Sequence, residues 1–226
     1  GRNTAVGYQC LTVQDAGVNA YNTAVGYHAG VAITTGDFHT LIGGLAGDAL
    51  TTGAANVAMG YSALSSEDSH NYNVAIGYRS LATQDAGQHA YNTAVGSDAG
   101  RLISTGIYNT LIGGLAGDAL TTGENNVALG YAALSTETIT GRVVALGYNT
   151  LASQRSDSHT YNVAVGYETG KAITTGVRNT LVGGFAGDAL TTGERNVALG
   201  YNALSTEDAH GRNTAAGYQC LTVQDA

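Results

Sequence analysis

The sequence has no proline and few charged residues. None of its 226 residues is Pro, although proline makes up about 5% of ordinary proteins, and Asp, Glu, Lys and Arg together account for only 12%. The net charge of −8 argues against a nucleic-acid-binding surface, and the low charge content argues against a disordered acidic tail. A chain that excludes proline throughout is expected to use nearly every backbone N–H as a hydrogen-bond donor.

Long apolar runs and a set of cysteines are missing as well. No run of apolar residues approaches the roughly 18 that a membrane-spanning helix needs, and the first residues do not resemble a secretory signal. We therefore expect no membrane segment. The chain does not begin with Met, and we expect it to be a segment of a longer protein. Its two cysteines, Cys10 and Cys220, occupy equivalent places in a duplicated segment, which favours small apolar fillers over a disulfide scaffold.

What the sequence does contain is a repeat. The motif N-[TV]-[AL]-[VILM]-G-Y begins thirteen times, with successive spacings of 19, 17, 17 and 17 residues. This set of spacings recurs three times and defines 70-residue blocks, approximately 3–72, 73–142 and 143–212, followed by a partial block over 213–226. We expect residues 1–226 to form a single repetitive domain in which each motif belongs to one coil.

Two columns of the aligned motif hardly vary within the chain. The fifth is Gly in all thirteen copies, which indicates a positive φ or a backbone packed too closely for a Cβ atom. The first is Asn in eleven copies, with His39 and Val143 as the exceptions, and stacked asparagines can form a hydrogen-bonded ladder. We assign structural roles to both columns. The glycine column comprises Gly7, Gly26, Gly43, Gly60, Gly77, Gly96, Gly113, Gly130, Gly147, Gly166, Gly183, Gly200 and Gly217. The asparagine ladder comprises Asn3, Asn22, Asn56, Asn73, Asn92, Asn109, Asn126, Asn162, Asn179, Asn196 and Asn213.

The motif alternates as a β-strand does. Its first, third and fifth residues are Asn, Ala and Gly, while its second, fourth and sixth are Thr or Val, a branched aliphatic residue and Tyr. A coil this short has no room for both a strand and a crossover helix, so tight turns must join parallel strands. The sequence therefore predicts an all-β fold, a parallel β-solenoid or β-roll of 17- and 19-residue coils.

No charged residue occupies any of the six motif columns. A sheet with one wet face carries charges at alternate positions, so we infer that both sides of this sheet are covered, one by the coil interior and the other by a neighbouring chain. A threefold bundle along the fibre axis would cover that side, and a single-chain solenoid is the alternative. Charged residues come later in each coil, where we expect an exposed rim that includes Glu67, Glu137 and Glu207.

The repeats resemble those of two families. The stretches Asn22 to Gly30, Asn126 to Leu134 and Asn196 to Leu204, which read N-[TV]-A-[VL]-G-Y-x-A-[GL], resemble the head repeats of trimeric autotransporter adhesins (YadA-like) and the GxNTAxGYxAL arrays of phage tail-fibre-type proteins. This resemblance implies a homotrimeric left-handed β-roll that serves as an extracellular shaft or adhesive head. Both coil lengths in this chain exceed that of the adhesin unit.

The function we expect is structural. We predict an extracellular shaft, of a virion fibre or a cell-surface appendage, that supplies length and rigidity. An adhesin head that binds a host-surface glycan or protein through rows of tyrosines is the alternative. Paired threonines such as Thr34 and Thr35 raise a remote ice-binding hypothesis.

Sequence motifs for catalysis or metal binding are weaker than those for a structural role. GGLAGDALT at 43–51 and 113–121 approaches a calcium-binding nonapeptide repeat, but it occurs once in four coils, so Asp48, Asp118 and Asp188 are expected to be turn residues. Nearly every Asp and Glu has a counterpart at the same place in another block, and no unlike groups form a recognisable catalytic set. We therefore expect no enzyme activity, no cofactor and no metal site.

Overall fold

The protein is an all-β parallel solenoid. The computed structural model describes residues 1–15, 17, 19–139, 141–206 and 209–222, and these contain no helix. Each coil contributes one strand of three residues, taken from the second to fourth positions of the motif. The strands are β1 Thr4–Val6, β2 Thr23–Val25, β3 Thr40–Ile42, β4 Val57–Met59, β5 Val74–Ile76, β6 Thr93–Val95, β7 Thr110–Ile112, β8 Val127–Leu129, β9 Val144–Leu146, β10 Val163–Val165, β11 Thr180–Val182, β12 Val197–Leu199 and β13 Thr214–Ala216.

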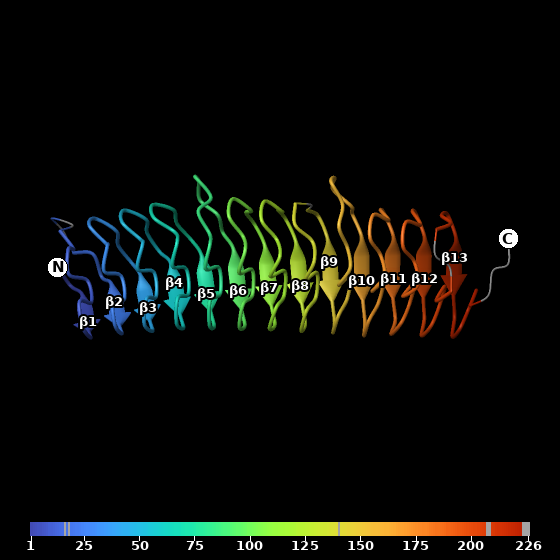
Figure 1. Cartoon of the computed structure of the whole chain (residues 1–226), viewed down its shortest axis with the longest axis horizontal. Coiled ribbons are helices and arrows are strands. Elements are labelled where there is room, and N and C mark those ends of the chain that lie inside the picture. Colours follow the sequence, from blue (N-terminus) through green and yellow to red (C-terminus); the bar gives the residue numbers. More distant parts are fainter. Residues whose placement is uncertain (16, 18, 140, 207–208, 223–226) are drawn as a thin grey trace. The chain divides into compact units, whose positions relative to one another are not determined.

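The chain divides into two compact units, Gly1–Asn109 with β1 to β6 and Thr110–Ala226 with β7 to β13. In each unit the strands follow chain order and pair in parallel, with equivalent residues opposite one another (Figure 1). In the first unit, for example, Leu41 lies between Ala24 and Ala58 of the neighbouring strands. In the second, Leu181 has the same place between two alanines. The period of the repeat therefore sets the register of the sheet.

Left-handed residues turn the chain after each strand. The residue two places after the column glycine has a φ between 49° and 58° in every coil, although it is never glycine. In the second coil this residue is His28, whose N–H donates to Tyr8 O of the preceding coil, while the N–H of Gly30 donates to Ala46 O of the following coil. A left-handed residue with a side chain costs about 1–2 kcal/mol. Here the left-handed turn residues direct N–H groups toward both the preceding and the following coil. The hydrogen bonds that result offset that cost.

The core is filled by side chains of complementary size. Leu41 is fully buried at the centre of β3, and Gly30 and Gly47 flank it in the turns. A Cβ atom would lie 2.8 Å from a Leu41 methyl at Gly30 and 2.9 Å from one at Gly47. The next coil reverses the sizes, with Ala58 in its strand and Leu64 in the place of Gly47. Because interiors are close-packed, the coils of a block are not interchangeable.

Two acidic residues lie inside this core, and our expectation of an exposed rim at these positions is wrong. Glu67 and Glu137 are 0% exposed. They occupy the coil position at which other coils carry Ile33 and Leu50, so their side chains point inward with that column. Glu207, the third residue expected there, lies outside the described residues. Charges elsewhere along the turns, such as Arg79 and Lys171, are substantially exposed.

The column glycines bring the backbones of adjacent coils into close contact. Their φ angles lie between 131° and 144°, a conformation that residues with a Cβ atom rarely adopt. A Cβ atom would also collide with the next coil. At Gly43 it would lie 2.5 Å from the carbonyl oxygen of Gly60, and at Gly166 it would lie 2.7 Å from that of Gly183. Both physical reasons for an unvarying glycine therefore apply together.

Gly77→Ala should lower the free energy of unfolding by at least about 2 kcal/mol. The change adds backbone strain, about 1–3 kcal/mol for such a conformation, and a collision with the carbonyl oxygen of Gly96. Denaturant unfolding followed by circular dichroism measures the effect.

Gly87→Ala is the matched control for this prediction. Gly87 has a φ of +67°, but a Cβ atom there would meet nothing within 4 Å, so only the loss from strain remains. Equal losses in the two variants would contradict the proposed collision between coils.

Candidate functional site

The asparagine column forms a ladder that runs along each unit. In the first unit the N–H of His39 donates to Asn22 Oδ1 at 2.8 Å, and the Asn22 Nδ2 group donates to Gly36 O at 2.9 Å. In the second unit Asn179 N–H and Nδ2 make the same two bonds, to Asn162 Oδ1 and Gly193 O. Asn3 and Asn213 are partly exposed. The other nine asparagines of the column are buried: Asn22, Asn56, Asn73, Asn92, Asn109, Asn126, Asn162, Asn179 and Asn196.

The ladder links side chains mainly to the backbone, whereas stacked asparagines suggest bonds between side chains. The backbone N–H of the column residue lies at the entry to the strand, where the side-chain oxygen of the preceding coil accepts its hydrogen bond. Because a buried N–H without a partner costs about 1–3 kcal/mol, each asparagine side chain stabilises the stacking of its own coil on the next. Asn109 also donates through Nδ2 to Asn92 Oδ1.

His39 replaces asparagine in this ladder and reproduces both of its bonds. Its Nε2 lies 2.7 Å from Gly53 O, and its Nδ1 lies 3.3 Å from the Asn56 nitrogen. Since the Asn56 N–H is a donor, Nδ1 must be the unprotonated nitrogen and the ring must be neutral. Burial lowers the pKa of His39, against smaller raising effects of the Gly53 carbonyl and Asp37. Val143, the other exception, has no polar side-chain atom with which to continue the ladder.

The opposite side of the strands forms a face that the single chain leaves partly open. We call the second, fourth and sixth motif residues the outer strand face. In β12 and the residues after it, this face consists of Val197, Leu199 and Tyr201, which are 42%, 54% and 46% exposed. No charged residue occurs on it in any coil. The inner side of each strand is covered by its own coil, so this outer strand face is the surface available to a partner.

The tyrosines of the outer strand face, which are the sixth motif residues, form stacked rows. In the first unit the Tyr8 and Tyr27 rings stack with centroids 5.6 Å apart, and in the second Tyr148 and Tyr167 stack at 5.2 Å. A second row of aromatic residues, just before the motif, contains the stacked pair Tyr72 and Tyr91 at 4.9 Å. Stacking covers one face of each of these rings, and the first row is interrupted where the sixth motif residue is Gly or Ser.

The threonine pairs do not form a free array of hydroxyl groups. Thr34, Thr51 and Thr121 are the first residues of three pairs, and the hydroxyl of each donates to a backbone carbonyl in the next coil. These hydroxyls serve the stacking of coils, which weakens the ice-binding hypothesis.

The aspartates of the calcium-like motif do not come together. Asp48 and Asp188 are only partly buried, and burial raises the pKa of each carboxyl. One described cluster contains three or more possible metal-ligating side chains, and Asp48, Asp118 and Asp188 are not part of it. That cluster, which we call the carboxylate–histidine cluster, consists of Glu67, Asp68, His70 and Asp85. Sequence analysis missed it because its members lie on two adjacent coils.

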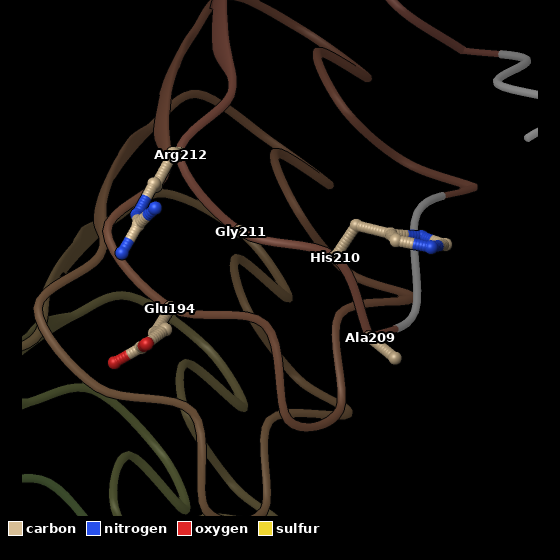
Figure 2. A pocket seen from close by; sticks show the side chains of 5 residues that line it. All are labelled: Glu194, Ala209, His210, Gly211 and Arg212. Atoms are coloured by element: carbon tan, nitrogen blue, oxygen red, sulfur yellow. The ribbon is translucent and has the colours of Figure 1, made fainter.

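A surface pocket in the second unit is lined by Glu194, Ala209, His210, Gly211 and Arg212. Figure 2 shows the Glu194 and Arg212 side chains on one side of the chain and His210 on the other. The lining contains a histidine but no hydroxyl or thiol nucleophile, and Glu194 forms an ion pair with Arg195 at 2.7 Å. These groups do not assemble a nucleophile and a general base in one place.

Comparison with protein-family models, with curated proteins and with solved structures gave no match to this chain. In the described part of the chain, no helix has the length and apolar character needed to cross a membrane. The function is therefore argued from the residues and from the geometry of the coils.

The neutral His39 predicts a dependence of stability on pH. Because its pKa is lowered in the folded protein, the unfolded chain binds the proton more readily. The contribution of His39 to stability is complete above pH ~6.5 and is lost as the pH falls from there toward the folded pKa, by at most about 1.4 kcal/mol per pH unit. Denaturant midpoints measured across this pH range test the prediction.

His39→Asn should remove this part of the pH dependence, since asparagine makes the same bonds in the other coils. The exposed His89 provides the control, and His89→Asn should leave the pH dependence as in the wild type. If the wild type and His39→Asn lose stability equally on acidification, His39 is not the titrating group.

Proposed function

We propose that this chain is the structural shaft of an extracellular fibre, built from three parallel copies that pack through their outer strand faces. The observation that carries this proposal is the uncharged outer strand face of each unit, which a single chain leaves partly exposed. Monomeric proteins rarely expose apolar patches larger than a few hundred Å².

The area of the outer strand face supports a partner of the same kind. Five residues of extended chain span roughly 16 Å, and six or seven coils spaced about 4.8 Å apart give a footprint on the order of 500 Å² for each unit. A stable interface buries about 800 Å² on each partner, so the outer strand face of a single unit supplies more than half of that area. Every coil also offers uncharged side chains in the same three columns, which suits a copy stacked with the same period.

Threefold symmetry is supported by the parallel strands and by the resemblance to trimeric adhesin repeats. A rotation axis along the stack keeps all chains parallel and brings equivalent coils to the same level, whereas a twofold axis across it would reverse one chain. The extracellular location rests on the same resemblance. Glycan binding by the tyrosine rows is less well supported, because a stacked neighbour already covers one of the ring faces that a sugar would contact.

Leu199→Glu tests the shaft proposal. The wild-type assembly should have about three times the 22.9 kDa mass of one chain. A carboxylate at this exposed position of β12 should dissociate the assembly, because a buried charge without a partner is costly. Light scattering coupled to size exclusion measures the mass.

The control variant is Thr192→Glu, which places the same charge at an exposed turn residue away from the outer strand face. It should keep the trimeric mass. A wild-type chain that is a folded monomer would overturn the proposal.

A further inference from the structure

The carboxylate–histidine cluster joins two adjacent coils of the first unit. Glu67, Asp68 and His70 lie between β4 and β5, and Asp85 lies in the longer loop after β5. His70 Nδ1 is 2.5 Å from Glu67 Oε1, 3.7 Å from Asp85 Oδ1 and 3.9 Å from Asp68 Oδ1. All four potential ligand atoms lie within 4.8 Å of one another.

One imidazole nitrogen cannot satisfy three carboxylates. It carries at most one proton, and its shortest contact is with Glu67 Oε1. Asp68 accepts a hydrogen bond from the Ser69 hydroxyl, and Glu67 Oε1 also accepts one from the His70 N–H. Burial raises the pKa of Glu67. With all three carboxylates ionised, an excess of two negative charges remains within a few ångströms even beside a protonated ring. Such an arrangement is stabilised by a bound cation.

The equivalent site 70 residues further along the chain lacks the cluster. We name each site, including the residues that the next coil adds to it, by the block that contains its glutamate: the first block for Glu67 and the second for Glu137. Glu137, the equivalent of Glu67, is buried in the same way, but Gln154 Nε2 donates to its Oε2 at 3.1 Å. In the first block the equivalent glutamine, Gln84, donates instead to Ser104 O. Glu67 Oε2 has only a long contact of 3.4 Å with Asn73 Nδ2. A fully buried carboxylate oxygen therefore lacks a hydrogen bond of ordinary length.

The residues around these two glutamates differ as a set. In the second block Thr138, Thr140 and Arg155 occupy the places of Asp68, His70 and Asp85. The arginine supplies a fixed positive charge at the position where the first block has a carboxylate. Where the potential ligands surround the glutamate, at Glu67, the nearby glutamine donates elsewhere. Where those ligands are replaced, at Glu137, the glutamine donates to the glutamate. This exchange points to a cation in the first block.

We propose that Glu67, Asp68, His70 and Asp85 bind a divalent metal ion of the zinc type that fastens the fourth coil to the fifth. Ligands about 2.0–2.2 Å from zinc in a tetrahedron lie roughly 3.3–3.6 Å from one another, so the spacings in the cluster require shifts of about an ångström. Nδ1 gives up its proton on binding and coordinates through its lone pair. Three carboxylates and one imidazole are all possible zinc ligands and complete four-fold coordination, and a metal that bridges two coils stabilises the folded state.

The same residue types recur two blocks further along the chain, at Glu207, Asp208, His210 and Asp225. Glu207, Asp208 and Asp225 lie outside the described residues, so the proposal concerns the first block alone. Because the full chain contains both sets of residues, the experiment compares the zinc bound by each variant with the zinc bound by the wild type.

The full chain is dialysed against zinc chloride, and bound zinc is counted by mass spectrometry. The test variant is Asp68→Thr with Asp85→Arg, which gives the cluster the residues that the second block carries and changes two exposed side chains. It should bind one zinc per chain fewer than the wild type, and zinc should raise its unfolding temperature less. Asp85→Asn alone, a milder change, should weaken zinc binding at least tenfold.

Asp157→Asn is the matched control, because it removes an exposed carboxylate from the loop after β9, which corresponds to the loop after β5 that carries Asp85. It should bind as much zinc as the wild type. The proposal is overturned if the wild type binds no zinc, or if the double variant and the wild type bind the same amount.

Discussion

The structure depends on hydrogen bonds between successive coils. Each strand is only three residues long, so its ladder alone could not hold a coil in place. The bonds continue beyond the strand, through the left-handed turn residues and through the buried asparagine column. The column glycines allow the approach that these bonds require, since a Cβ atom would meet the carbonyl group of the next coil. Proline is absent because so many N–H groups are donors.

This arrangement separates two surfaces of the strand. The inner surface carries the polar ladder, in which the buried asparagine side chains bond to neighbouring coils, and small core side chains. The outer strand face carries aliphatic and tyrosine side chains without any charge. In the proposed shaft, the coils would supply regular length and the outer strand faces would hold the copies together. The metal ion proposed for the carboxylate–histidine cluster would add a local link between two coils.

Much of the fold could be predicted from the sequence because the same motif, with the same packing requirements, occurs thirteen times. The glycine column, the alternation of the motif and the short coil length together indicate a parallel solenoid. The burial of Glu67 and Glu137 was not predicted, because acidic residues are rarely buried and their column also contains Ile33 and Leu50. The bonds of His39 and the carboxylate–histidine cluster depend on which coils are adjacent, which single motifs do not reveal.

Amide hydrogen exchange, resolved by NMR, tests the central claim most directly. The N–H groups of Asn56 and Asn179, which donate to ladder side chains of the preceding coil, should exchange slowly, and slow exchange should recur at the coil period. The N–H groups of Gly87 and Asp157, at exposed bends in the longer loops after β5 and β9, should exchange quickly. Equally fast exchange at the ladder and loop positions would contradict the account.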